Sequence, residues 1–238
     1  MKESARELDM TPAWIYTLIP AAIAILGAII SVNVRPGPIL VNAIQHFAAG
    51  VVFAAAAGEI MPDVMHSGAL VATLIGGFAG IGVMLAIRQL ERVIEGPAGL
   101  LTLVGVDILI DGLVLGIAFA AGAKAGLLLT IALSVEVLFL GLAVTTELSQ
   151  TVKSRVRIVL VIAALILLLP LGALVATPIA GLPDQYITAF LSFGLIALLY
   201  LVTEELLVEA HETPDKPWVA AMFFIGFLLL LSLEEVMA

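Results

Sequence analysis

The apolar stretch from Leu101 to Ala121 carries two aspartates near its middle, at positions 107 and 111. This stretch is long enough to cross a bilayer as a helix. A carboxylate at the centre of a membrane costs about 2.5–3.5 kcal/mol on insertion scales, so Asp107 and Asp111 need a partner, a proton or a water-filled cavity. Their i, i+4 spacing places both on one helix face. Lys and Arg occur only between the apolar segments or at their ends, so we expect the compensating positive charge to come from outside the chain.

The composition of the chain excludes a soluble protein. Hydrophobic residues make up 62% of the 238 residues and charged residues only 12%. A soluble domain of this size cannot bury so much apolar surface, so we expect the solvent to be lipid. Cysteine is absent, which excludes disulfides, thiolate metal sites and nucleophilic thiols. The formal charge of −9 and its distribution do not indicate a nucleic-acid partner, and no organic cofactor is expected.

The chain divides into eight apolar segments of membrane length with short connections. Because backbone polar groups find no water in the hydrocarbon, these segments must be helices. The sequence therefore predicts an all-α polytopic membrane protein with one transporter domain, residues 1–238. The predicted helices cover about 13–32, 39–61, 69–88, 98–121, 125–147, 157–177, 185–208 and 218–236.

Basic residues indicate the orientation. The connections after the first, third, fifth and seventh segments carry most of the Lys and Arg, which places those connections in the cytoplasm. We therefore expect a multi-pass protein of the cell membrane with both termini on the periplasmic or extracellular side. The residues on the predicted cytoplasmic side are Arg35, Arg88, Arg92, Lys153, Arg155, Arg157 and Lys216, and those on the other side are Lys2, Arg6 and Lys124.

The second and seventh segments end in similar patterns. Glu59 and Asp63 precede His66, and Glu205 and Glu209 precede His211, with the second acid four positions after the first in each case. These two segments cross the membrane in opposite directions. If they are related, they therefore belong to an inverted repeat, as in many transporters. The sequence thus predicts three helices, a central pair and three further helices, a 3+2+3 inverted-repeat arrangement.

The fifth segment carries one acid near its centre, Glu136. Only a few residues join the fourth and fifth segments, so these should be antiparallel neighbours. Asp107, Asp111 and Glu136 lie at about the same distance from that turn, and hence at the same depth. Oxygen ligands of this kind suit hard divalent cations, at about 2.0–2.6 Å. The alternative is that the acids are protonated and hydrogen-bond neighbouring helices.

These residues resemble the Zrt/Irt-like (ZIP) family of divalent metal permeases. The fourth-helix pattern of that family is His-Asn-x-Pro-Glu-Gly, and this chain reads Asp107-Ile-Leu-Ile-Asp111-Gly112, with Leu113-Val-Leu-Gly116 following. On the fifth helix Glu136 takes the position of the first Gln or His, and Gly141 is retained. Glu205 resembles the seventh-helix acid that completes the family's second metal position. The resemblance implies eight spans with both termini outside, inverted three-helix repeats and a metal site between the fourth and fifth helices.

The departures from the family pattern concern the second metal position. Ile108, Val137 and Leu140 stand where the family has ligands, so we expect one carboxylate site to remain. Without imidazole or thiolate, this site should favour Mn²⁺, Fe²⁺, Mg²⁺ or Ca²⁺ over Zn²⁺, the family's usual substrate. Three anions exceed the charge of one divalent ion, so we also expect one carboxyl to hold a proton until metal enters.

Other polar residues lie near the ends of the segments. Glu59, Asp63 and His66 form either a collecting mouth for cations or an ordinary interfacial helix end. Acids and a histidine at the end of the seventh segment receive the ion on release or simply face solvent. His46, with Asn42 and Gln45, either bridges helices or binds metal. The residues at the end of the seventh segment are Glu204, Glu209, His211, Glu212 and Asp215.

The function expected from these features is transport of divalent metal cations such as Zn²⁺, Mn²⁺ or Fe²⁺ into the cytoplasm by alternating access. The metal is the substrate, and a homodimer is one arrangement that the resemblance implies. The alternative is a proton-coupled carrier of another small solute, or a metal sensor that does not transport. Intramembrane aspartyl proteases carry their aspartates on different helices within Tyr-Asp and Gly-x-Gly-Asp motifs. Neither motif occurs here, so no enzymatic activity is expected.

Overall fold

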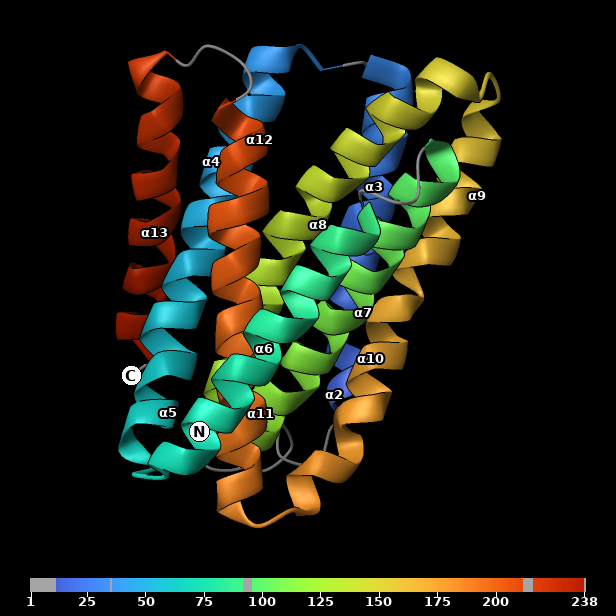
Figure 1. Cartoon of the computed structure of the whole chain (residues 1–238). Coiled ribbons are helices and arrows are strands. Elements are labelled where there is room, and N and C mark those ends of the chain that lie inside the picture. Colours follow the sequence, from blue (N-terminus) through green and yellow to red (C-terminus); the bar gives the residue numbers. More distant parts are fainter. Residues whose placement is uncertain (1–11, 35, 92–95, 212–215, 238) are drawn as a thin grey trace.

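The computed structural model is helical, with no strand, over the residues it describes, 12–34, 36–91, 96–211 and 216–237 (Figure 1). Eight of its helical stretches are long and apolar enough to span a membrane, as the sequence predicted. Arg35, Arg92, Lys2, Arg6, Glu212 and Asp215, which the sequence analysis also uses, lie outside the described residues. The spans are Ala13–Val34, Pro38–His66, Leu70–Leu90, Gly99–Ala121, Ala123–Thr151, Arg155–Gly181, Asp184–His211 and Pro217–Met237.

Four of the spans are single α-helices, and the other four contain a break. The first and sixth spans each have a short irregularity, and the second and seventh each contain a π-helical turn. The single helices are α6 (Leu70–Glu91), α7 (Pro97–Ala121), α8 (Ala123–Thr151) and α13 (Pro217–Met237). The broken spans consist of α2 (Ala13–Tyr16) with α3 (Leu18–Val34); α4 (Pro38–Ala55), η1 (Ala56–Ile60) and α5 (Met61–His66); α9 (Arg155–Ile166), α10 (Leu168–Ala176) and the 3₁₀ turn η2 (Thr177–Gly181); and α11 (Asp184–Tyr200), η3 (Leu201–Leu206) and α12 (Leu207–His211).

The second and seventh spans run further than predicted. The sequence placed their ends near residues 61 and 208, whereas the helices continue to His66 and His211. In the second span Pro62 explains the error, because a proline removes one backbone donor and normally ends or bends a helix. Here the π-helical turn η1 ends two residues before Pro62 and changes the hydrogen-bond register, so the helix continues beyond it.

The helices form two groups, which Figure 1 shows side by side. In the first group α3 packs on α8, and α10 packs on α7. In the second group α4 packs on α13, and α11 packs on α6. The groups meet where α4 contacts α8 and where α11 contacts α7. The helices that carry the predicted metal site, α7 and α8, therefore lie at the centre of the molecule.

These contacts have the symmetry that the repeat predicts. In a repeat of this kind the first, second and third spans correspond to the sixth, seventh and eighth, and the fourth corresponds to the fifth. Under this exchange the contact between α3 and α8 corresponds to the contact between α10 and α7. The same exchange turns the contact of α4 with α13 into that of α11 with α6, and the contact of α4 with α8 into that of α11 with α7. Because corresponding spans cross in opposite directions, this is the 3+2+3 inverted-repeat arrangement.

Candidate metal site

Three carboxyl groups from α7 and α8 meet in the centre of the bundle. One oxygen each from Asp107, Asp111 and Glu136 lies within 4.8 Å of the other two. Only Gly122 separates α7 from α8, so the helices leave the turn as antiparallel neighbours and bring the three acids to one level. This is the convergence that the sequence predicted.

The three side chains lie largely out of contact with solvent. Asp111 and Glu136 are each 3% exposed, and Asp107 is half-buried. The Asp111 and Glu136 side chains lie close enough to interact directly, while Glu136 Oε2 has no hydrogen-bond partner among the described residues. A buried acceptor without a partner is costly, and a cation would satisfy it.

The electrostatic surroundings of the site are acidic. Among the described residues, the charges that act on Asp107, Asp111 and Glu136 come from each other, from Glu205 and, for Asp107, from Glu209. None of these charges belongs to Lys, Arg or His. The prediction that the chain supplies no positive charge at this level therefore holds in the described structure.

Two glycines allow neighbouring helices to pack closely against the acidic pair. A methyl group at Gly112, next to Asp111, would lie 2.0 Å from the carbonyl oxygen of Leu169 on α10. A methyl group at Gly141 on α8 would lie 2.5 Å from the carbonyl oxygen of Ala24 on α3. Both distances are far below contact, so these positions require glycine. The close packing keeps α7 and α8 fixed at the level of the carboxyl groups.

The positions at which the family resemblance implies further ligands are part of the apolar core. Ile108 is 2% exposed and Val137 is 1% exposed, and both pack in one cluster with Ile166 and Leu169. Leu140 lies at the edge of the same cluster. At these three positions the chain therefore offers no polar ligand atoms.

Glu205 reaches the site from the second group of helices. It lies in η3, is half-buried, and is close enough to act electrostatically on all three carboxyl groups. Its role as a site residue stays a prediction. A fourth acid thus lies near the three carboxyl groups, at the boundary between the two groups of helices.

Glu59, Asp63 and His66 do not converge on one point. Among the described residues, only Asp107, Asp111 and Glu136 form a group of three or more potential ligands within 4.8 Å. Glu59 instead forms an ion pair with Lys124, with 3.1 Å between Lys124 Nζ and Glu59 Oε1. Asp63 and His66 are exposed. Glu59 thus has a basic partner, Lys124, in this structure.

The polar residues of α4 bridge to α12. Asn42 donates a hydrogen bond to the carbonyl oxygen of Ala210, and Gln45 donates one to Glu209 Oε2, both at 2.9 Å. The rings of His46 and His211 lie 5.4 Å apart. Asn42 and Gln45 therefore bridge α4 and α12, whereas His46 Nδ1 hydrogen-bonds the Asn42 carbonyl oxygen of its own helix, so both interpretations of His46 stay open.

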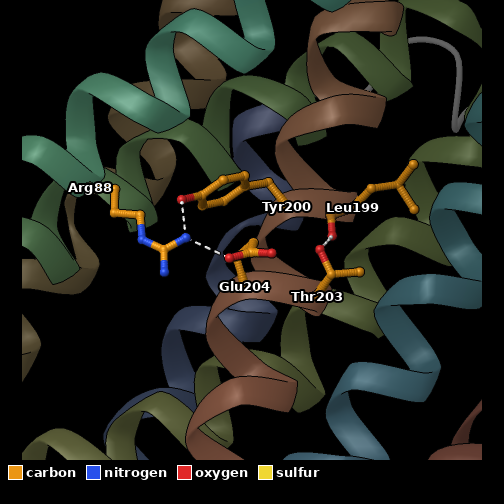
Figure 2. A network of polar contacts seen from close by, with 5 residues as sticks. All are labelled: Arg88, Leu199, Tyr200, Thr203 and Glu204. Carbon is orange, nitrogen blue, oxygen red and sulfur yellow. Dashed lines mark hydrogen bonds and ion pairs between the residues drawn. The ribbon is translucent and has the colours of Figure 1, made fainter.

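A polar network around Arg88 was not expected from the sequence, where Arg88 served only as a marker of orientation. Arg88 Nη1 donates a hydrogen bond of 2.5 Å to Glu204 Oε2 and one of 3.4 Å to the Tyr200 hydroxyl (Figure 2). Thr203 donates a hydrogen bond to the Leu199 carbonyl oxygen one turn back. Two of its members, Thr203 and Glu204, lie in η3, and Glu204 directly precedes Glu205 in the sequence.

Comparisons with known proteins do not assign the chain to a family. No family model matches it, and no curated protein matches it significantly. Membership of the ZIP family therefore stays a prediction that rests on the residues quoted above.

Proposed function

We propose that this protein carries divalent metal cations across the membrane, into the cytoplasm, and that Asp107, Asp111 and Glu136 bind the ion. The observation that carries the proposal is the buried group of three carboxyl groups on which no described basic residue acts. Acids within membrane spans are rare and expensive, and they usually mark an ion pathway. A visiting cation supplies the charge that this group lacks.

The chemistry of the ligands favours a hard cation. All the candidate ligand atoms are carboxylate oxygens, which suit Mg²⁺, Ca²⁺ and Mn²⁺ better than soft metals. One divalent ion balances two carboxylates, and the third carboxyl holds or releases a proton. We therefore expect Mn²⁺ or Fe²⁺ to compete well with Zn²⁺ at this site.

The arrangement of the helices supports alternating access. Asp107, Asp111 and Glu136 belong to the first group of helices, whereas Glu205 belongs to the second. A rocking movement of one group against the other would change the distance between Glu205 and the other three acids while α7 and α8 stay together. Such a movement around a central site is the usual mechanism of transporters with inverted repeats.

The test is uptake of Mn²⁺ by proteoliposomes that contain the purified protein. We expect saturable uptake by the wild type and none by Glu136→Gln, with Glu147→Gln on the same helix as a control. Loss of uptake should accompany loss of Mn²⁺ binding. Binding without uptake in the wild type would favour a sensor, and uptake that survives Glu136→Gln would refute the site.

A further inference from the structure

The two π-helical turns of the repeat each carry a glutamate that forms an ion pair with another helix. Counted from the first residue of each turn, Glu59 in η1 and Glu204 in η3 are both fourth. Glu59 pairs with Lys124 of α8, and Glu204 pairs with Arg88 of α6. Counted from the last residue of each turn, Glu59 instead corresponds to Glu205, as in the sequence pattern, because η3 is one residue longer than η1.

The residue after each paired glutamate has a different chemistry in the two halves. In η1 it is Ile60, which is 2% exposed and belongs to the apolar core. In η3 it is Glu205, which acts electrostatically on Asp107, Asp111 and Glu136. The residue after the paired glutamate thus adds an apolar side chain to the core in one turn and a carboxyl group near the metal site in the other. π-helical turns of this kind frequently occur at functional sites.

Arg88 holds η3 at two points. Its guanidinium contacts Tyr200, directly before the first residue of η3, and Glu204, the fourth residue. Figure 2 shows Arg88 reaching from α6 to both side chains on the same face of the turn. The helix that carries Arg88 is itself fixed, because a methyl group at Gly76 of α6 would lie only 1.9 Å from the Ala189 carbonyl oxygen on α11.

We propose that Arg88 and Glu204 are positioning residues, which hold η3 in the orientation that directs Glu205 at the metal carried by α7 and α8. This inference rests on the proposed function, since it treats Glu205 as a ligand or close counter-charge of the bound ion. Arg88 and Glu204 do not touch the ion. They act through Glu205.

The experiment is a double-mutant cycle on Mn²⁺ affinity, measured on the full-length protein in detergent by electron paramagnetic resonance of free Mn²⁺. We expect Arg88→Gln to weaken Mn²⁺ binding about 10-fold or more, as changes beside metal ligands commonly do. In the Glu205→Gln background the same change should weaken binding less than about twofold, because the carboxylate through which Arg88 influences the ion is already gone. Arg88→Lys, which retains the ion pair with Glu204, should restore most of the affinity.

Three measurements separate this role from a structural one. The Arg88–Glu204 pair is 42% exposed on both sides, so its loss should change the metal-free Tm by no more than about 4 °C. Arg155→Gln removes another exposed arginine, which bonds Asn33 away from η3, and should leave Mn²⁺ affinity unchanged. The charge-swapped pair Arg88→Glu with Glu204→Arg should recover part of the affinity lost by Arg88→Glu alone.

The inference is overturned if Arg88→Gln leaves Mn²⁺ affinity unchanged, or if it weakens binding equally in the wild-type and Glu205→Gln backgrounds. It is also overturned if Glu205→Gln by itself has no effect. Failure of the proposed function gives a different result, in which Glu136→Gln binds Mn²⁺ as tightly as the wild type.

Discussion

Replacing Glu136 by Gln should have opposite effects on the protein with and without metal. The substitution preserves the shape of a side chain that is 3% exposed. It also removes one carboxyl group from a cluster in which the charges that act on Glu136 all come from other acids. The amide of the introduced glutamine can donate a hydrogen bond to Asp111, which a carboxylate cannot. Without metal, the Tm of Glu136→Gln should therefore equal or exceed that of the wild type.

The magnitude with metal follows from mass action. An ion at 100 times its Kd stabilises the folded protein by about 2.7 kcal/mol. For a chain of this length that corresponds to a rise in Tm of about 5–11 °C, at about 2–4 °C per kcal/mol. If loss of one of three ligands weakens binding about 100-fold, the same concentration of ion stabilises the variant by only about 0.4 kcal/mol, and Tm rises by about 1 °C.

The assay is thermal unfolding of purified protein in detergent, with and without Mn²⁺, for the wild type, Glu136→Gln and Glu147→Gln. Glu147 is an exposed acid on the same helix that accepts a hydrogen bond from Gln150, so it controls for loss of a charge on α8. A Glu136→Gln variant that unfolds earlier without metal and keeps the full Mn²⁺ shift would refute the reasoning.

Three further outcomes follow from the same geometry. Binding of Mn²⁺ should release about one proton, because three clustered carboxyl groups exceed the charge of one divalent ion and one of them should hold a proton until the ion enters; calorimetry in buffers of different ionisation enthalpy would contradict this by finding no release. In competition for uptake, Zn²⁺ should not exceed Mn²⁺ by orders of magnitude, and such an excess would exclude an all-carboxylate site. Gly112→Ala should lower the free energy of unfolding by about 1–3 kcal/mol, because the added methyl group overlaps Leu169. Gly82→Ala is the control, because a methyl group there meets nothing within 4 Å. Equal Tm values for the two variants would show that α7 and α10 are not tightly packed.

The central site could be predicted because it is formed by two helices that are adjacent in the sequence. Only Gly122 separates α7 from α8, so counting residues from the turn is sufficient to bring Glu136 to the level of Asp107 and Asp111. Membrane spans also have one dominant signal, a long apolar run, which makes their number easy to predict. Their ends are harder, as the continuation of the second span beyond Pro62 shows.

The contacts around the site could not be predicted in the same way. Whether Lys124 meets Glu59 depends on how α8 lies against the second group of helices, and no local pattern encodes that distance. Hydropathy does not distinguish a π-helical turn from an α-helical one, so the pairing of Glu204 with Arg88 could not be predicted. The sequence pattern matched Glu59 with Glu205 and so did not single out Glu204.

The most direct test of the account is to locate bound Mn²⁺ by its anomalous scattering in crystals of the protein grown with the ion. The account predicts a peak between α7 and α8, about 2.0–2.6 Å from carboxylate oxygens of Asp107, Asp111 and Glu136. A peak elsewhere, for example beside Glu59, with none at these three residues would contradict it.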